Sequence, residues 1–290
     1  MTREPFDYTS DAVQAQIGQI IANALAEDIG DGDVTTLLTI PETAMVDGDF
    51  IAKEAGVAAG LAVVAQVFRQ LSDQVQVTPL AADCERVAAR QVMATIHGPG
   101  RAILTGERVA LNFLQRMSGI ATLTRRYVDA VQGTHAVILD TRKTAPGLRV
   151  LDKWAVRLGG GQNHRFGLYD MAMIKDNHLA AVGSLAAAVQ RVRQGDPRQR
   201  PIEVEVTNLE QLRDALQQPV DRIMLDNMSL AQMTDAVRMT AGRIPLEASG
   251  NVNLNTVAAI AATGVDFISA GALTHSVKAL DISLDLRSRT

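Results

Sequence analysis

The stretch that decides the fold is residues 202–226, IEVEVTNLEQLRDALQQPVDRIMLD. It holds a short apolar run that ends near Glu205, a helical stretch, and a second apolar run that ends at Asp226. Further apolar runs begin at Leu246 and Phe267, so successive runs start 20, 24 and 21 residues apart. This spacing suits one strand plus one helix, and it predicts parallel strands joined by helices.

The same pattern covers the whole second half of the chain. Six apolar runs are expected to form strands, at residues 136–140, 171–175, 202–206, 222–226, 246–249 and 267–270. Four helical stretches are expected among them, at 183–194, 208–217, 229–240 and 253–263. Six or seven such units in succession favour a parallel barrel or near-barrel over a doubly wound sheet. No GxGxxG motif follows the first run, which argues against a dinucleotide site.

The first part of the chain has a mixed pattern, typical of a smaller α+β domain. Helices are expected over 10–27 and 60–71, and strand regions over 43–58 and 85–97. A longer helical pattern over 101–132 is interrupted at Ser118 and Gly119. We interpret this interruption as the hinge into a second domain.

The composition excludes several classes of protein. Lys+Arg 28 against Asp+Glu 32 gives a net charge of −4, so no overall positive field attracts nucleic acid or acidic lipid. The longest uncharged apolar stretch, between Glu54 and Arg69, is too short to span a bilayer. The single cysteine, Cys84, can form neither an internal disulfide nor a cysteine-based zinc site. We therefore expect a cytoplasmic protein with no nucleic-acid or membrane partner.

Polar residues stand at the end of each apolar run in the second half. They are Asp140 with Arg142 and Lys143, then Lys175, Glu205, Asp226, Ser249, and Gly271 followed by His275. The carboxyl ends of parallel strands gather at one rim, where the active sites of such folds lie. The alternative is that charges appear there simply because solvent begins at strand ends. Six consecutive strands with this feature favour a common site.

The segment from Arg142 to Lys175 is cationic, with seven basic and two acidic residues. Three of the basic residues, Arg149, Lys153 and Arg157, are four apart and are expected on a solvated helix face. The others point to a small ligand with several negative charges, because guanidinium groups bind carboxylates and phosphates through paired hydrogen bonds.

Glycine-containing turns and two acidic residues extend this interpretation. The turns at 159–161 and 249–251 suit a phosphate, since backbone amides at such turns bind anions. Glu205 and Asp226 end adjacent strands and could bind ribose hydroxyls or Mg²⁺. They could equally cap a helix or pair with an arginine of the rim.

Eight motifs occur in order along the chain: GDVTT at 32–36, GERVALN at 106–112, SGIAT at 118–122, DTRKT at 140–144, GGGQNHR at 159–165, IKDNH at 174–178, LEASG at 246–250 and GALTH at 271–275. Together they resemble one known family, the quinolinate phosphoribosyltransferases. Each motif is modest alone, but their order along nearly the whole chain makes the resemblance specific.

The resemblance implies an α/β fold, with an N-terminal α/β sandwich domain and an incomplete, seven-stranded parallel α/β barrel. We expect the sandwich over residues 1–115, the barrel over 116–275, and a tail over 276–290 that packs back on the first domain. It also implies a homodimer whose active sites are shared between subunits. The implied reaction joins quinolinate and phosphoribosyl pyrophosphate, with Mg²⁺, and yields nicotinate mononucleotide, pyrophosphate and CO₂.

The resemblance also assigns roles to residues at the matching positions. Those implied to hold the quinolinate carboxylates are Arg142, His164, Arg165 and Lys175, with Arg108 reaching the site of the neighbouring subunit. Those implied to contact the phosphoribosyl substrate are Thr141 and Lys143, then Glu205 and Asp226 for the ribose and Mg²⁺, and Ser249, Gly250, Ala270, Gly271 and His275 for the 5′-phosphate. The residues expected to serve the chemistry itself are Lys143, Lys175, Glu205 and Asp226. Asn251 departs from the pattern, which has a glycine here, although asparagine tolerates left-handed backbone angles.

Three other functions are compatible with parts of this pattern. A strand-end lysine such as Lys175 could form a Schiff base in an aldolase. The chain could be a non-catalytic relative that binds a phosphosugar and regulates another protein. A related barrel enzyme could also use a different pyridine acid, such as nicotinate. Borohydride trapping and substrate assays distinguish these alternatives.

Overall fold

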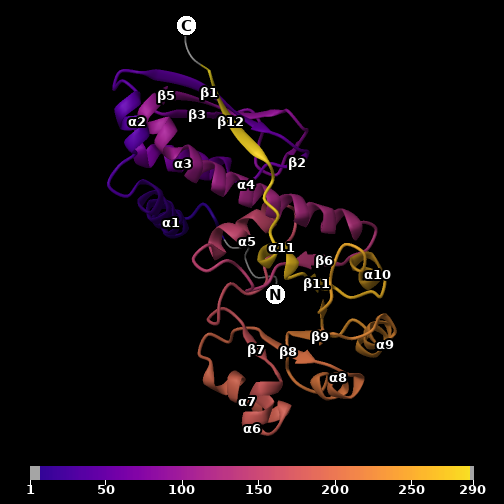
Figure 1. The fold of residues 1–290 in the computed structure, drawn as a ribbon. Coiled ribbons are helices and arrows are strands. Elements are labelled where there is room, and N and C mark those ends of the chain that lie inside the picture. The colour runs from indigo at the N-terminus through magenta and orange to yellow at the C-terminus, as the bar shows by residue number, and fades with distance from the viewer. Residues whose placement is uncertain (1–6, 288–290) are drawn as a thin grey trace. The chain divides into compact units, whose positions relative to one another are not determined.

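The computed structural model describes residues 7–287, which form two compact units (Figure 1). The first unit combines residues up to 125 with 145–160 and the chain from 277 onward, and the second combines 126–144 with 161–276. Neither unit is continuous in sequence. Of the expected tail over 276–290, the last three residues lie outside the described part of the chain, as do residues 1–6.

A four-stranded antiparallel sheet forms the centre of the first unit. Its order is β12 (Ile282–Arg287), β1 (Met45–Ala52), β5 (Val92–Pro99) and β3 (Gln76–Pro79). β2 (Gly56–Val57) and β4 (Arg86–Val87) form a separate pair. In β1, buried Phe50 and Ala52 alternate with more exposed positions, the period expected of a sheet with one covered face.

Five helices belong to the first unit, wholly or in most of their length. They are α1 (Asp11–Ile29), α2 (Val34–Thr39), α3 (Leu61–Leu71), α4 (Gly100–Ala130) and α5 (Arg149–Leu158). α1 buries one residue per turn, and α3 packs on the sheet through Phe68, whose ring lies 6.4 Å from that of Phe50. The layer of helices on a sheet confirms the predicted sandwich.

Helix α4 runs without a break through Ser118 and Gly119, so the predicted interruption there is wrong. Both residues serve close packing instead. The Ser118 hydroxyl accepts from the Ala59 amide at 3.1 Å and donates to the Ala59 carbonyl at 3.2 Å. A Cβ at Gly119 would lie 2.2 Å from the Lys278 carbonyl oxygen, so only glycine allows this approach. The two small residues are needed for contacts of α4 with other segments of the unit.

Helix α5 also departs from expectation, because Lys153 is fully buried rather than on a solvated face. Arg157 is exposed, as predicted. The neighbouring Asp152 is buried too and accepts from Arg116 of α4 through Nε at 2.8 Å and a guanidinium Nη at 2.9 Å. A buried carboxylate is stabilised by such a two-point contact. Charge spacing alone could not distinguish this inner surface from an outer one.

The second unit is built on a six-stranded, all-parallel sheet. Its order is β6 (Val137–Leu139), β11 (Phe267–Ser269), β10 (Leu246–Ser249), β9 (Arg222–Asp226), β8 (Ile202–Val206) and β7 (Ala172–Ile174). These are the six runs predicted to be strands, each within a residue or two. From β7 to β11 neighbours in space follow each other in sequence, as in a barrel.

The barrel is open between β6 and β7, and the number of paired strands is six rather than the seven implied by the resemblance. Gln162 partly takes the place of the seventh. It makes a one-residue parallel bridge with Leu139, its amide donating to the Ile138 carbonyl at 2.8 Å while the Asp140 amide donates to its carbonyl at 3.2 Å. The segment that follows Gln162 is thereby held beside the free edge of β6.

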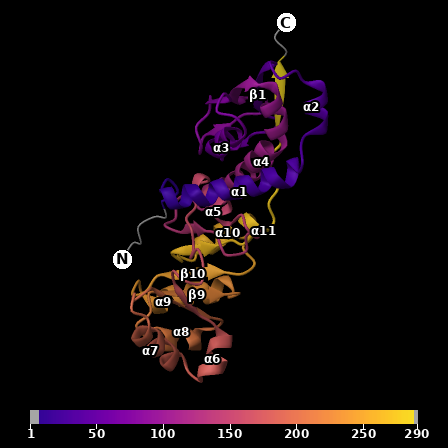
Figure 2. The ribbon, with the colours of Figure 1, turned by 90° about the vertical axis from the view of Figure 1, so that its left-hand side faces the viewer.

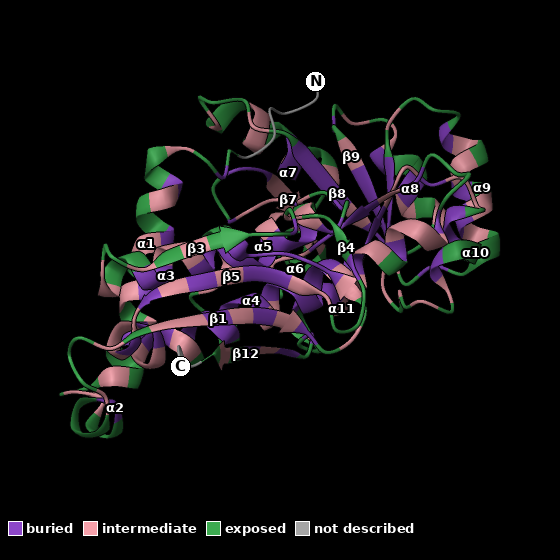
Figure 3. Ribbon diagram, turned by 90° about the horizontal axis from the view of Figure 1, so that it is seen from above, coloured by how far each residue is buried: buried purple, intermediate pink, exposed green. Residues whose placement is uncertain are grey.

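Helices follow the strands of the second unit. They are α6 (Asp176–Val182), α7 (Leu185–Gly195), α8 (Leu209–Ala215), α9 (Leu230–Thr240), α10 (Val257–Ala261) and α11 (Ala272–His275). α7, α8 and α10 pack against β7, β8 and β11. Figure 2 shows α7 and α8 below β9 and β10 in the view. β8 and β9 are largely buried, whereas α9 and α10 alternate buried and exposed positions (Figure 3). Within residues 7–287, every helix is too short or too polar to traverse a bilayer.

Candidate functional site

The strands of the second unit present one inner face, which their register identifies. Glu203 of β8 and Glu247 of β10 lie on strands separated by β9, yet each has a carboxylate oxygen within 3.3 Å of His164 Nε2. Their side chains therefore point into the concavity of the curved sheet. Because side chains two residues apart share a face, Glu205 and Ser249 point to the same side, one layer nearer the carboxyl ends of the strands.

Lys175 and Glu205 form an ion pair at this rim. Met173 is aligned with Glu203 in the β7–β8 ladder, so Lys175 and Glu205 are neighbours on the same face. Lys175 Nζ contacts Glu205 Oε2, and the lysine side chain is 43% exposed against 13% for the glutamate. The pair confirms that the ends of two strands meet, and it leaves the ammonium group accessible to a ligand.

Asp226 and Ser249 are register partners at the ends of β9 and β10. The loops that follow them interlock: the Asn227 amide donates to the Ser249 carbonyl at 2.9 Å, and Asn251 Nδ2 donates to Asn227 Oδ1 at 3.3 Å. Gly250 has φ +94°, and a Cβ there would lie 2.1 Å from Asn227 Oδ1. Asn251 adopts φ +52°, so the turn persists without the expected second glycine.

The ends of β6 and β11 also meet. The Thr274 hydroxyl donates to the Lys143 carbonyl at 2.9 Å, and a Cβ on Gly271 would lie 3.2 Å from Lys143 Cδ and 3.0 Å from His275 Cδ2. The Thr141 hydroxyl accepts from the Lys143 amide at 3.0 Å. Ala270, which links β11 to this turn, donates its amide to the Leu139 carbonyl of β6 at 3.0 Å.

Two arginines from different segments repel each other electrostatically. They are Arg142 of the DTRKT segment and Arg165 of the GGGQNHR segment. Partial burial, and then the positive charge of Arg142, lower the pKa of the Arg165 guanidinium, while Glu203 and Asp170 act in the opposite direction. Arg165 is steered by a hydrogen bond from Nη1 to the Met171 carbonyl at 3.1 Å. An anion beside both guanidinium groups would relieve their repulsion.

His164 lies below the rim, in a buried charged cluster. Its Nε2 is 3.0 Å from Glu203 Oε2 and 3.3 Å from Glu247 Oε1. Burial alone would lower its pKa, but Glu247 and Glu203 raise it to about 9. Burial would likewise raise the pKa of Glu247, but His164 and then Arg222 lower it to about 2. Burial, and then the charge of Glu247, raise the pKa of Glu203.

The glutamates of this cluster were not among the residues singled out from the sequence. The signal was present in IEVEV and LEAS, where a charged residue stands inside an otherwise apolar run, two positions before the rim residue. A charge at such a position of a buried strand needs partners, because an unpaired buried carboxylate is strongly unfavourable. Its partners come from other strands, which the sequence pattern does not identify.

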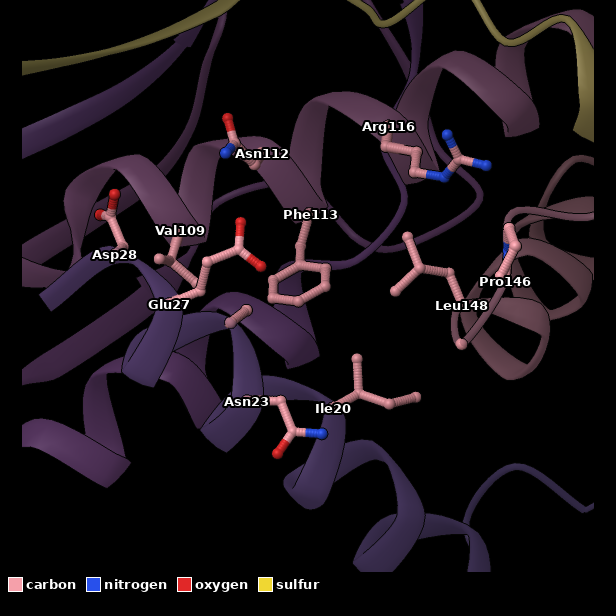
Figure 4. Close-up of a pocket in the computed structure, with 12 residues that line it drawn as sticks. Ile20, Asn23, Glu27, Asp28, Val109, Asn112, Phe113, Arg116, Pro146 and Leu148 are labelled. Carbon is pink, nitrogen blue, oxygen red and sulfur yellow. The ribbon is translucent and has the colours of Figure 1, made fainter. Parts of the chain in front are cut away.

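Arg108 lies on α4 in the first unit, where its side chain is exposed. A cavity of about 430 Å³ in the same unit is lined by α1, α4 and the loop before α5, and none of the predicted site residues lines it. Figure 4 shows Phe113 amid its lining, with Arg116 toward the loop that carries Pro146 and Leu148. All of the residues that line this cavity belong to the first unit.

The fold and the rim define an α/β protein of open-barrel type, with cationic side chains at the carboxyl ends of its strands. Family models match most of the chain: "Quinolinate phosphoribosyl transferase, N-terminal domain" matches residues 33–118, and the corresponding C-terminal domain matches 120–285. The chain belongs to the quinolinate phosphoribosyl transferase family.

Individual relatives agree with this membership. The chain is 45% identical over 271 residues to a probable nicotinate-nucleotide pyrophosphorylase (carboxylating) of Bacillus subtilis, covering 93% of each chain. It is 46% identical over 286 residues to the chloroplastic nicotinate-nucleotide pyrophosphorylase (carboxylating) of Oryza sativa, covering 92% of this chain and 76% of that protein. The crystal structure of NadC from Streptococcus pyogenes superposes with a TM-score of 0.92 at 42% identity, covering 96% of this chain and 99% of that one.

Proposed function

We propose that the protein transfers a phosphoribosyl group from phosphoribosyl pyrophosphate to quinolinate and decarboxylates the product to nicotinate mononucleotide. One observation supports this above the others. Cationic and glycine-containing segments far apart in sequence, from Thr141 to His275, lie at the carboxyl ends of one parallel sheet. Relatives of similar length at about 45% identity carry the name of this activity.

Quinolinate is a dicarboxylate. The guanidinium groups of Arg142 and Arg165 form a clamp that binds its carboxylates, and the Lys175 ammonium group assists them. The side chain of Lys143 and the turn at Gly271 support the phosphoribosyl group, and the left-handed turn at Gly250 offers backbone amides to its 5′-phosphate. Holding two anions that repel each other is the main contribution of these residues to the rate.

Mg²⁺ fits the residues at the ends of β8 and β9. Glu205 and Asp226 lie on one face of the sheet, two positions out of register on neighbouring strands, and Mg²⁺ prefers one or two carboxylates completed by substrate oxygens and water. When bound, the ion would neutralise charge on the departing pyrophosphate. Asp226 accepts from Asn227 Nδ2 at 2.9 Å, which fixes the orientation of its carboxylate.

The chemistry requires no protein nucleophile. As pyrophosphate leaves, positive charge develops on ribose C1 and its ring oxygen, and Glu205 and Asp226 stabilise it electrostatically. The pyridine nitrogen of quinolinate then bonds to C1. CO₂ then departs and leaves the electron pair of the C2–carboxylate bond on C2, where the adjacent pyridinium nitrogen stabilises it. A proton from solvent then adds to C2 and gives nicotinate mononucleotide. Lys175 and the arginines hold the ring so that its nitrogen faces C1.

Substrate assays test the proposal directly. Wild-type protein with quinolinate, phosphoribosyl pyrophosphate and Mg²⁺ should consume quinolinate and release one CO₂ per nicotinate mononucleotide formed. Nicotinate in place of quinolinate should give no turnover, and borohydride should trap no adduct on Lys175. Arg142→Ala should lose quinolinate binding with the fold intact. Turnover of nicotinate, an adduct on Lys175, or no turnover of quinolinate would favour one of the other functions.

We further propose that the protein forms a homodimer in which Arg108 of one subunit completes the site of the other. We also propose that it acts in the cytoplasm. The exposure of Arg108 on α4 is compatible with this role. Mixing Arg108→Ala chains with Lys175→Ala chains should restore part of the activity, because some mixed dimers then contain one intact site. Mixed dimers that form but remain inactive would refute shared sites.

A further inference from the structure

The buried cluster beneath the rim contains more ionisable groups than the proposed reaction uses. His164 is 5% exposed, and both glutamates beside it are fully inaccessible. Replacing buried ion pairs by apolar side chains is often neutral or stabilising, so their presence is weak support for a role in stability alone. The question is what else the cluster holds in place.

Glu247 is fixed from several directions. Arg222 Nη1 donates to its Oε2 at 2.9 Å, and the Ser269 hydroxyl donates to its Oε1 at 2.5 Å. The Arg222 guanidinium itself lies 4.1 Å from the centre of the Phe267 ring, a cation–π contact. The carboxylate of Glu247 is therefore held rigidly, and His164 Nε2 contacts both this carboxylate and that of Glu203.

The His164 ring is engaged on both nitrogens. Its Nδ1 accepts from the Arg165 backbone amide at 2.6 Å, and its own amide donates to Asp140 Oδ1 at 2.9 Å. A ring that accepts at Nδ1 carries one proton, on Nε2 and directed at the glutamates, so the additional proton that the coupled pair of His164 and Glu203 retains lies on the carboxyl group. The ring thus links the buried carboxylates to the backbone of Arg165, whose guanidinium group interacts electrostatically with that of Arg142.

We infer that Glu203 and Glu247 are positioning residues, which hold the His164 ring and through it the Arg165 backbone, and that His164 supports the quinolinate clamp from below without itself binding quinolinate. This inference rests on the proposed function, because the clamp is defined by quinolinate. It assigns the buried cluster a positioning role in quinolinate binding, although none of its side chains contacts quinolinate.

The same three side chains offer ligand atoms within 4.8 Å of one another, a spacing that a divalent cation could also use. Arg222 already supplies a positive charge to Glu247, and Ser269 occupies the other oxygen of that carboxylate. A proton between His164 Nε2 and Glu203 satisfies the geometry with no further cation. Metal in this cluster is therefore an outcome that would contradict the inference.

Three variants test the positioning role by quinolinate binding, measured by calorimetry beside the KM for phosphoribosyl pyrophosphate. Glu203→Leu removes the acceptor facing Nε2, and quinolinate affinity should fall at least tenfold while the other KM changes less than twofold. Glu203→Gln keeps an acceptor oxygen and should restore most of the affinity. Ser269→Ala removes one bond to Glu247 while Arg222 still holds that carboxylate, and it should lower quinolinate affinity less than Glu203→Leu does. Equal losses for both substrates in Glu203→Leu would indicate a merely structural role and overturn the inference.

Nitrogen NMR of the five histidines gives a readout independent of turnover. One ring, identified by its loss in His164→Gln, should show the tautomer protonated on Nε2, and quinolinate should leave that tautomer unchanged. A change of tautomer on quinolinate addition, or stoichiometric metal in the purified protein, would refute the inference. If wild-type protein does not bind quinolinate at all, the proposed function fails, and the tautomer still tests the link between the cluster and Arg165.

Discussion

Raising the pH from 6.5 to 9 should destabilise the protein through the cluster around His164. The groups that face its ring are Glu203 from β8 and Glu247 from β10, with Arg222 from β9 paired to the latter. The pKa of His164 is about 9 in the folded protein and 6.5 in an unconstrained histidine. The pKa of Glu203 is also raised. The folded cluster therefore keeps a proton that the unfolded chain has released.

The sign and size follow from proton linkage. A raised pKa contributes stability that is fully present below the unfolded value and is lost as the pH rises through the folded value. Between pH 6.5 and 9 the folded state binds one proton more than the unfolded state, and each pH unit is worth about 1.4 kcal/mol, so the loss approaches about 3 kcal/mol. That is a large share of the roughly 5–15 kcal/mol typical of a protein.

Urea unfolding at several pH values between 6.5 and 9 measures this loss. Circular dichroism follows both units, and the fluorescence of Trp154 follows the first unit, so coincident transitions would justify a single free energy of unfolding. The control is the double variant His164→Gln, Glu203→Gln, which keeps hydrogen-bonding amides but cannot bind the proton. Wild type should lose about 3 kcal/mol relative to this control across the range. Parallel curves for the two proteins would refute the reasoning.

Five further substitutions, at four positions, test contacts elsewhere. Gly119→Ala should lower the free energy of unfolding by about 2 kcal/mol or more, because its Cβ would meet the Lys278 carbonyl at 2.2 Å, whereas Gly195→Ala, with nothing within 4 Å, should be neutral or better in thermal melts. Asp152→Asn should cost about 3 kcal/mol in urea unfolding, because it leaves Arg116 without its buried carboxylate. Asn251→Gly should leave the KM for phosphoribosyl pyrophosphate within about twofold, while Asn251→Val should raise it, because a β-branched residue resists φ +52°.

The barrel was predictable from the sequence because each of its strands has a local sequence pattern that identifies it. An apolar run such as 222–226 has a polar residue at its end, and parallel topology then brings those ends together without further information. The resemblance to the quinolinate phosphoribosyltransferases predicted the family and the enzyme class, and the comparisons with known proteins confirm both. What remained open was the number of strands, because the seventh is reduced to the bridge at Gln162.

The features that sequence reasoning missed all depend on contacts between distant segments. Gly119 looks like a helix breaker until the Lys278 carbonyl is placed beside it, and Lys153 looks like a surface residue until the rest of its unit encloses it. Glu203 and Glu247 look like rim residues displaced by two positions. Local pattern gives the face of a strand, but the partner that makes a buried charge tolerable lies elsewhere in the chain.

The two layers of the inner face also explain how the rim keeps its positive field. In the buried layer, Arg222 balances Glu247, and the retained proton balances Glu203, so the layer has no net charge. Because this buried layer is neutral, only the carboxylates of the rim itself offset the positive charge of the rim cations. If the proton were lost, the buried layer would become negative beside Arg165, whose charge already interacts with Glu203, and it would compete with anionic substrates for that arginine. The cluster that fixes Arg165 therefore also protects its charge, because the pair of side chains that holds the Arg165 backbone is the pair that retains the additional proton.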